Sequence, residues 1–341
     1  MSSRIEYLDG HRGLAILSVV LFHAYARWSD IVPYGEEYKN AFKFGWLGVQ
    51  LFFLISGFVI LMTLEKCKNF EDFLYRRWLR LFPAMLICSL IIFATGPIFN
   101  ERPAGPVTAT GLIPGLLFIE PSWFKHIFGL NISPLEGAFW SLYVEFKFYV
   151  IAGLLYFFTG RLKLIVILII MSALAHFSQI ISSHNNYSIF LPLSKLTYAL
   201  SFQHFGWFAG GATAYCYLKT KDIKWLLFAT SIITYCSITI GFGNYVTSIY
   251  AALIGVIFIL SLKISWIQCI LNHPIFQFFG YVSYPLYLLH ENIMIASIVI
   301  IGKLDLPVPL FTIPLLPISL LSATAFVVAK YGEPFIKKWL P

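Results

Sequence analysis

Charged residues are scarce in this chain: Asp, Glu, Lys and Arg form 12% of its 341 residues, against roughly 25% in ordinary soluble domains. Hydrophobic residues form 59% of it. A soluble protein of this length could not bury so much apolar surface in its own core. This composition excludes an ordinary soluble enzyme and predicts an integral membrane protein.

Several chemical motifs are also missing. The five cysteines form no CxxC pair, so neither a disulfide framework nor a zinc site is expected. The sequence contains no P-loop, GxSxG, HExxH or Rossmann fingerprint. The formal net charge of +8 does not indicate nucleic-acid binding, because the basic residues lie between the apolar runs. We therefore expect no metal, no permanently bound cofactor and no nucleic-acid partner.

The apolar runs have the length of membrane helices and lack the alternation of barrel strands. They predict an all-α integral membrane protein, a single transmembrane domain over residues 1–341 with no appended soluble domain. Ala24-Tyr25-Ala26 resembles a signal-peptidase site at the end of the first apolar run. We nevertheless expect this run to be retained as a span, because Glu6 and Asp9 precede it. Segment 108–120 is short and contains Gly and Pro, so a re-entrant or interfacial position is expected. About ten spans are predicted: 12–29, 46–64, 81–99, 139–159, 164–181, 193–218, 225–241, 245–262, 277–301 and 307–329.

Lysine and arginine are distributed unequally between the loops on the two sides of these spans. The richer set includes the segments before the first span and after the last one. Because loops rich in Lys and Arg stay in the cytoplasm, both termini are predicted to be cytoplasmic. The expected location is the inner (cytoplasmic) membrane, as a multi-pass protein.

His23 is an ionisable residue at bilayer depth, roughly 16 Å into the first span at 1.5 Å per residue. It shares a helical face with Arg12, because eleven residues make almost three turns. Ionisable groups at this depth are functional candidates, although a structural hydrogen-bonding role is the alternative. The alignment with Arg12 favours the functional interpretation.

Glu145 lies in the run FWSLYVEFKFYV, with Ser141 and Tyr149 one helical turn away on either side. Lys147 lies on the opposite face and cannot pair with it in the same helix. A partner from another helix is expected, and His23 is a candidate. Helix packing alone is the alternative.

His290 and Tyr287 belong to the run SYPLYLLHE, in which Pro285 is expected to bend the helix. His290 could act as a second catalytic group, a substrate ligand or a hydrogen-bonding group. Three other polar residues in the spans are expected mainly to join helices: His176, Gln203 and His204. The pair Ser56-Gly57 is expected to permit close helix packing.

Three arginines form a cluster in FLYRRWLRLFPAM: Arg76, Arg77 and Arg80. Their spacing of three and four residues places them on one patch of a helix. A plain positive-inside anchor would need charge but not arginine. The choice of three arginines favours bidentate binding of phosphate groups.

Taken in order, these runs resemble the acyltransferase-3 family of membrane O-acyltransferases. The matching stretches run from residue 4 to residue 335: RIEYLDGHRGLAILSVVLFH, GWLGVQLFFLISGFVI, RRWLRLFP, FWSLYVEFKFY, SYPLYLLH and GEPF. The chain departs from the family pattern at Gln50, where many members carry Asp, and at Lys147, where Gln is frequent. The resemblance implies transfer of acyl groups from cytoplasmic acyl-CoA to acceptors on the far side of the membrane.

The resemblance also implies roles for particular residues. It places the essential histidine at His23 and the motif glutamate at Glu145, which we expect to be catalytic. It matches the family's arginines to four positions here, which we expect to bind acyl-CoA: Arg12, Arg76, Arg77 and Arg80. Tyr287 and His290 are expected to contact the acceptor.

The hypothesis is a membrane O-acyltransferase that moves an acyl group, expected to be acetyl, from acyl-CoA to a hydroxyl of a cell-surface or lipid-linked carbohydrate. Histidine can deprotonate that hydroxyl or accept the acyl group itself. A proton-coupled transporter of sugars or acyl compounds is the alternative, and a scaffold for envelope assembly is a third. The expected partners are acyl-CoA, a carbohydrate or glycolipid acceptor and membrane lipid. The sequence leaves the acceptor and the oligomeric state open.

Overall fold

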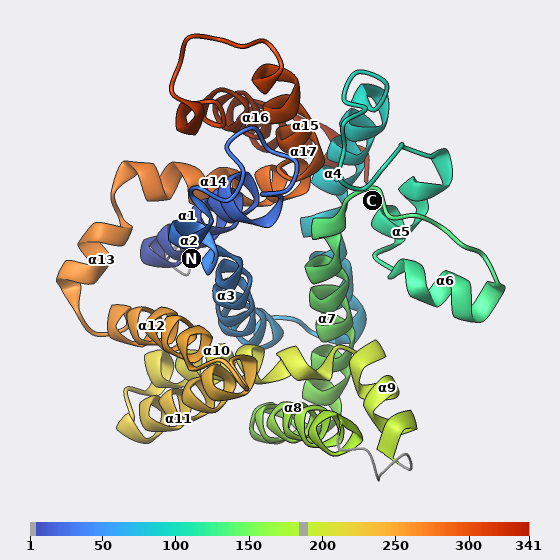
Figure 1. Cartoon of the computed structure of the whole chain (residues 1–341). Coiled ribbons are helices and arrows are strands. Elements are labelled where there is room, and N and C mark those ends of the chain that lie inside the picture. Colours follow the sequence, from blue (N-terminus) through green and yellow to red (C-terminus); the bar gives the residue numbers. More distant parts are fainter. Residues whose placement is uncertain (1–4, 184–189, 341) are drawn as a thin grey trace. The chain divides into compact units, whose positions relative to one another are not determined.

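A computed structural model describes residues 5–183 and 190–340, and all regular structure within these ranges is helical (Figure 1). The all-α prediction is confirmed for this part of the chain. The chain divides into two compact units. Unit 1 comprises Met1–Gly48, Trp78–Tyr143 and Leu271–Pro341, and unit 2 comprises Val49–Arg77 and Val144–Ile270.

Each helix belongs to a single unit, except for four helices inside which the divisions fall. The helices that cross a division are α3 (Gly48–Leu64), α4 (Phe70–Thr95), α7 (Trp140–Thr159) and α13 (Ser265–Leu271), whose last residue, Leu271, belongs to unit 1. Unit 1 also holds α1 (Glu6–Phe22), the π-helix η1 (His23–Arg27), α2 (Lys39–Phe42), α5 (Leu112–Leu117), α6 (Pro121–Phe128), α14 (Pro274–Leu289), α15 (Asn292–Gly302), α16 (Leu315–Val327), the π-helix η8 (Val328–Gly332) and α17 (Glu333–Lys337). Unit 2 also holds α8 (Arg161–Ser183), α9 (Leu191–Ala199), α10 (Phe205–Thr220), α11 (Ile223–Ile240) and α12 (Tyr245–Ser261).

The described residues contain six helices long and apolar enough to cross a membrane, or eight if two bent pairs each count as one span. These eight correspond to eight of the ten predicted spans. The other two predictions, 12–29 and 193–218, fall on α1 and α10, whose α-helical lengths are 17 and 16 residues. No helix between residues 108 and 120 reaches spanning length, as predicted. The count of ten stays a prediction.

Helix α4 begins eleven residues before the predicted apolar span at 81–99. Asn69 caps it, because the Asn69 Oδ1 accepts a hydrogen bond of 2.8 Å from the Asp72 backbone N–H. Glu71 and Asp72 in the first turn also complement the positive end of the helix dipole. The arginine cluster therefore lies on a helix rather than in a loop.

In unit 1, α1 and α14 pack side by side through glycine contacts (Figure 1). A Cβ atom on Gly13 would lie 2.0 Å from the carbonyl oxygen of Phe276, and one on Gly280 would lie 2.0 Å from that of Asp9. No larger residue fits these positions without moving backbone atoms. This close packing fixes the end of α1 beside the end of α14.

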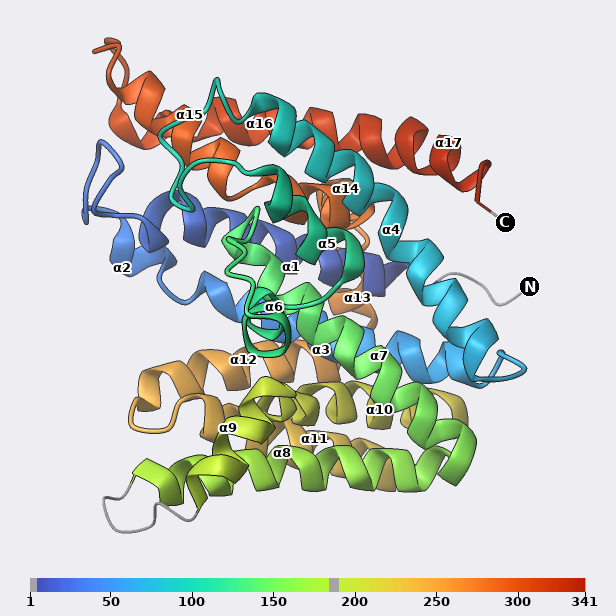
Figure 2. The same ribbon diagram turned by 90° about the vertical axis from the view of Figure 1, so that its right-hand side faces the viewer.

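In unit 2, α8, α10 and α11 run alongside one another (Figure 2), and α10 also packs on the unit 2 part of α3. A Cβ atom on Gly57 would lie 2.0 Å from the Phe208 carbonyl oxygen, and one on Gly211 would lie 1.8 Å from the Leu54 carbonyl oxygen. The predicted close helix approach at Gly57 is confirmed.

Two predicted continuous spans are broken helices. The prediction 193–218 corresponds to α9 and α10, separated by Leu200–His204. Lys147 compensates for this break, because its Nζ donates to the Ala199 carbonyl oxygen at 2.7 Å and to the Ser201 hydroxyl at 3.1 Å. Broken helices at membrane depth need such partners for their freed backbone groups.

The second break separates α14 from α15, which meet at a bend of 77°. The bend lies at His290–Glu291 and not at Pro285, where it was expected, because α14 runs through Pro285 to Leu289. His290, singled out in the sequence, thus sits at an interrupted helix, a common setting for ligand sites in membrane proteins.

Candidate active site

His23 is the first residue of the π-helix η1, which continues α1. Single π-helical turns inside α-helices are rare and frequently occur at functional sites. The α-helical register holds from Arg12 to Phe22, so Arg12 and His23 share a face as predicted. The wider π-turn then rotates Arg27 away from this line, and its guanidinium lies 4.9 Å above the Trp28 ring.

The imidazoles of His23 and His290 contact each other within unit 1, with His290 Nε2 3.2 Å from His23 Nδ1. His290 Nδ1 lies 2.8 Å from the Tyr287 carbonyl oxygen, and His23 Nδ1 lies 2.9 Å from that of Val19. A carbonyl oxygen only accepts, so both Nδ1 atoms carry a hydrogen. In neutral His290, Nε2 is therefore an acceptor, and the single Nδ1 hydrogen of His23 is shared between this nitrogen and the Val19 carbonyl oxygen.

This arrangement leaves His23 Nε2 without a hydrogen in the neutral ring. That nitrogen lies 3.7 Å from Glu291 Oε1, and the two side chains are 13% and 7% exposed. The distance is too long for a hydrogen bond but suits an ion pair once Nε2 gains a proton. His23 is thus arranged as a base whose charged form a carboxylate would stabilise.

Glu291 is held in position from the start of α7. Its Oε2 accepts a hydrogen bond of 2.6 Å from the Ala138 backbone N–H. A Cβ atom on Gly137 would lie 2.9 Å from the same oxygen, so a larger residue there would displace the carboxylate. The carboxylate is consequently fixed by backbone rather than by a mobile side chain.

A second carboxylate, Glu136, supports the broken helix. Its Oε2 accepts a hydrogen bond of 3.1 Å from the Asn292 backbone N–H and another from the Asn292 amide. Asn292 in turn accepts from the Ala104 backbone N–H at 2.9 Å. Glu136 thereby satisfies a backbone group freed at the first turn of α15.

Arg102 lies beside Glu136, with 3.6 Å between Arg102 Nη2 and Glu136 Oε1, and both side chains are buried. Burial raises the pKa of Glu136 well above its ordinary value, and the Glu291 carboxylate adds to this, while Arg102 opposes it. Burial lowers the pKa of Arg102, and Glu136 opposes that shift. Glu136 therefore interacts with the Arg102 guanidinium, with the Glu291 carboxylate and with the broken helix at Asn292.

Unit 2 holds a different cluster around Glu145. Glu145 Oε1 accepts hydrogen bonds of 2.6 Å from Ser56 and 2.5 Å from Tyr149. The Arg77 guanidinium lies 5.9 Å from the centre of the Tyr149 ring and donates to Thr63 at 3.4 Å. Tyr149 shares the helical face of Glu145 as predicted, and Ser56 on α3 is a partner from another helix, as expected. Ser141 instead contacts Tyr287 in unit 1.

The four predicted arginines differ in the hydrogen bonds and ion pairs that their guanidinium groups already form. Arg76 Nε donates to Asp72 at 2.7 Å, and Arg12 Nη1 donates to Asp9 at 2.7 Å. Arg80 lies 3.6 Å from Glu333 and 5.6 Å from the centre of the Tyr284 ring. Within the described residues, Arg77 Nε is buried without a hydrogen-bond partner. Arg77 is thus the best placed of the four to take a new anion.

Tyr287 is tied into unit 1 by its hydroxyl group. The hydroxyl donates to the Ala138 carbonyl oxygen at 2.9 Å and lies 2.7 Å from the Ser141 hydroxyl. His290 is fully buried and contacts His23. Both residues therefore line the centre from within, and a direct contact with an acceptor stays a prediction for each.

Sequence reasoning missed part of this centre. Glu291 ends the run SYPLYLLHE but was given no role, and no role was expected for Arg102 or Glu136. The available signal was the position of Glu136 and Arg102 in a connection rich in Gly and Pro, where charge is not needed for a turn. The residues added by the structure are Arg102, Glu136, Glu291 and Asn292.

Comparison with known proteins bears on the nature of this centre. The model of the acyltransferase domain (Acyl_transf_3) matches residues 5–331. The chain belongs to the acyltransferase-3 family. All the residues of both clusters lie within the matched range.

Several curated members of the acyltransferase-3 family and related proteins are similar to this chain. The peptidoglycan O-acetyltransferase OatA of Listeria monocytogenes is 25% identical over 370 residues, which cover 98% of this chain and 55% of that protein. The O-acetyl transferase of Shigella phage Sf6 is 27% identical over 170 residues, 48% of this chain and 50% of the phage protein. The acyltransferase MdmB of Streptomyces mycarofaciens is 31% identical over 158 residues, 45% of this chain and 39% of that protein.

The chain thus spans about half the length of the first two of these relatives. No solved structure gives a significant match to it.

Proposed function

We propose that this chain is a membrane O-acyltransferase that moves an acyl group, acetyl in the first instance, from acyl-CoA to a hydroxyl of a carbohydrate. The observation that supports it best is the His23–His290–Glu291 cluster, in which His23 keeps an unprotonated Nε2 beside a fixed carboxylate. Such a base suits the deprotonation of an alcohol near neutral pH.

The proposed step transfers the acyl group directly. His23 Nε2 takes the proton of the acceptor hydroxyl while the hydroxyl oxygen attacks the thioester carbonyl carbon. The carbon–sulfur bond then breaks, the new ester bond remains, and the proton leaves with the thiol of CoA. Glu291 stabilises the imidazolium formed in between, which is the role of the carboxylate in a catalytic triad.

On the donor side, we propose that the arginines bind the phosphates of acyl-CoA. Arg77 contributes most, since its buried Nε lacks a partner, while Arg12, Arg76 and Arg80 contribute the remaining positive charge. Glu145 orders this region by accepting from Tyr149, above whose ring Arg77 lies. We thus propose that Glu145 helps to bind the donor, and direct catalysis by Glu145 is the alternative.

The acceptor proposed is a carbohydrate hydroxyl outside the cytoplasm. The Listeria relative is named a peptidoglycan O-acetyltransferase, which supports a sugar of the cell envelope. Tyr287 and His290 are proposed to border the acceptor hydroxyl beside His23, because both belong to the same cluster.

The proposed topology has ten spans in the inner membrane with both termini in the cytoplasm. The Lys and Arg asymmetry supports it. Reporter fusions at Lys68 and Lys221 are expected to be cytoplasmic, and fusions at Lys39 and Lys303 extracytoplasmic. A fusion at Lys68 that reports from outside would contradict both the topology and the proposed donor side.

The function is tested with protein purified into lipid nanodiscs, labelled acetyl-CoA and glycan fragments of the cell envelope. The expected result is a labelled ester on the glycan together with an equal amount of free CoA. A proton-coupled transporter would move sugars across vesicles without releasing CoA. If CoA is released but neither the glycan nor the protein becomes labelled, the protein only hydrolyses the thioester, and the proposal is contradicted.

A further inference from the structure

Unit 2 contains a cavity that the proposed chemistry does not use. Its volume is about 380 Å³, at the lower end of the range of roughly 300–1,000 Å³ for small-molecule pockets. It lies where the last turns of α8 and α11 meet the first turns of α10. It is lined by His176, Gln179, Ile180, Gln203, His204, Trp207, Thr239, Ile240 and Phe242.

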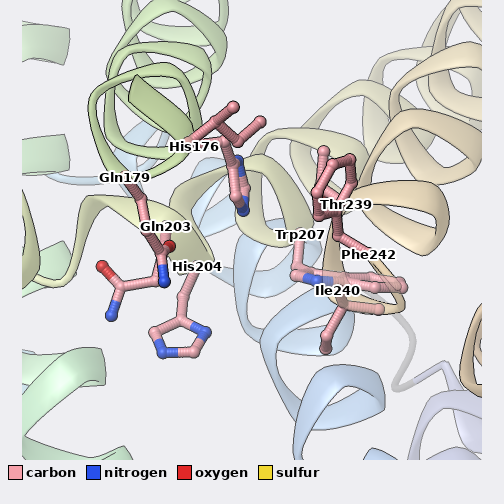
Figure 3. A pocket seen from close by; sticks show the side chains of 9 residues that line it. His176, Gln179, Gln203, His204, Trp207, Thr239, Ile240 and Phe242 are labelled. Atoms are coloured by element: carbon pink, nitrogen blue, oxygen red, sulfur yellow. The ribbon is translucent and has the colours of Figure 1, made fainter. Parts of the chain in front are cut away.

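The lining combines two kinds of surface. Figure 3 shows the polar side chains of Gln179, Gln203 and His204 on one side of the space, with Trp207 and Phe242 on the other. None of the nine lining residues is Asp, Glu, Lys or Arg. A charged ligand would therefore find no counter-charge among these nine side chains, and a purely apolar ligand would offer no partner to the buried Gln203 oxygen.

Gln203 gives a second and independent indication of a ligand. Its Oε1 is buried and, among the described residues, has no hydrogen-bond partner. Buried polar atoms are rarely left unpaired, because the loss of water costs free energy that only a partner returns. A ligand with hydroxyl or amide donors would satisfy this oxygen from within the cavity.

We propose that this cavity binds one neutral sugar residue of the acceptor glycan, an inference that rests on the proposed function for the identity of its ligand. A pyranose ring presents hydroxyl groups around its rim and apolar C–H faces, and the cavity offers amides and imidazoles together with the Trp207 and Phe242 rings. The cavity lies at the end of α8 and α11 that the predicted topology places outside the cytoplasm.

The site is tested first by binding without any acyl donor, so that the result does not depend on catalysis. Saturation-transfer NMR on protein in nanodiscs is recorded with glucose, galactose, mannose and N-acetylglucosamine. At least one sugar is expected to bind, and Gln203→Met is expected to weaken its binding about tenfold by removing the unpaired acceptor. Gln179→Met, which changes a more exposed wall, provides a second variant should Gln203→Met not fold.

A matched pair on α11 controls for general effects of the substitutions. Thr239 and Thr230 both donate to a carbonyl oxygen one turn earlier, but only Thr239 lines the cavity. Thr239→Val is expected to weaken sugar binding and Thr230→Val to leave it unchanged. Binding of none of the four sugars, or equal binding by the folded Gln203→Met and Gln179→Met variants, would overturn the site.

Transfer assays then separate this proposal from the proposed function. Gln203→Met is expected to raise KM for the glycan while KM for acetyl-CoA and CoA release into water stay unchanged. Sugar binding without any transfer by the wild-type protein would contradict the acyltransferase proposal and leave the sugar site standing. If the folded Gln203→Met variant transfers acetyl groups with an unchanged KM for the glycan, the sugar site is contradicted and the acyltransferase proposal stands.

Discussion

The two units hold carboxylates in different surroundings. In unit 1, Glu291 lies beside the basic nitrogen of His23 and is fixed by the Ala138 backbone N–H. In unit 2, Glu145 accepts from the hydroxyls of Ser56 and Tyr149 and has no imidazole among its hydrogen-bond partners there. A carboxylate beside a base can stabilise a proton in transit, whereas one held by hydroxyls mainly orders its neighbours. This difference supports our proposal that His23 and Glu291 in unit 1 transfer the proton, and that Glu145 and Arg77 in unit 2 take part in binding the donor.

The supporting groups differ in the same way. The histidine cluster lies at a helix break whose backbone is satisfied by Glu136, a second buried carboxylate. The Glu145 cluster lies on the continuous helix α7 and has the Arg77 guanidinium near its tyrosine. The cluster in unit 1 thus lies at an interrupted helix, whereas Glu145 lies within a continuous helix near an arginine.

The largest effect expected to separate the two carboxylates is on turnover. Glu291→Gln keeps the acceptor for the Ala138 N–H but cannot stabilise the imidazolium, so kcat should fall about 100-fold or more, with little change in KM for acyl-CoA. Glu145→Gln should raise KM for acyl-CoA and lower kcat far less. Kinetics with acetyl-CoA and glycan measure both constants. The opposite pattern would exchange the roles of the two units.

The next effect concerns the arginines of α4. Arg77→Lys keeps the charge but loses the bidentate fork, so KM for acyl-CoA should rise about tenfold, a loss of about 1.4 kcal/mol. Arg76→Lys provides the matched control on the neighbouring residue, because Asp72 already occupies Arg76. Its KM should change little. Equal effects of both substitutions would indicate that the cluster acts only as positive charge.

A smaller effect is expected at the helix break in unit 2. Lys147→Met removes the donor to the Ala199 carbonyl oxygen and should lower stability by about 1–2 kcal/mol, while transfer by the folded protein stays near normal. Lys163→Met, at an exposed lysine near the start of α8, is the control. Thermal unfolding in detergent measures both variants. An unchanged midpoint for Lys147→Met would show that the break does not depend on this lysine.

Much of this arrangement could be predicted because hydropathy and charge report directly on helices in a membrane. Eight predicted spans have counterparts, and the shared face of Arg12 and His23 follows from helical geometry alone. The contact between Glu145 and Tyr149 was predictable for the same reason, since residues four apart meet on a helix.

The remainder depends on contacts between segments far apart in the sequence. The π-turn at His23 and the bend at His290–Glu291 leave no mark in hydropathy, and Pro285 pointed to a bend five residues too early. Glu136 and Arg102 were not predicted, because hydropathy cannot show that a loop is buried against a helix break. Glu136 and its partner Asn292 lie more than 150 residues apart in the sequence.

The central claim, that His23 carries the proton during transfer, is tested most directly by His23→Gln and His23→Ala. Gln keeps hydrogen-bonding groups but has no basic nitrogen, so a structural histidine would tolerate it and a base would not. The measurement is acetyl transfer from labelled acetyl-CoA to glycan, normalised to folded protein in the membrane. Both variants are expected to insert and fold and to lose transfer about 100-fold or more. Near-normal transfer by the folded Gln variant would contradict the account.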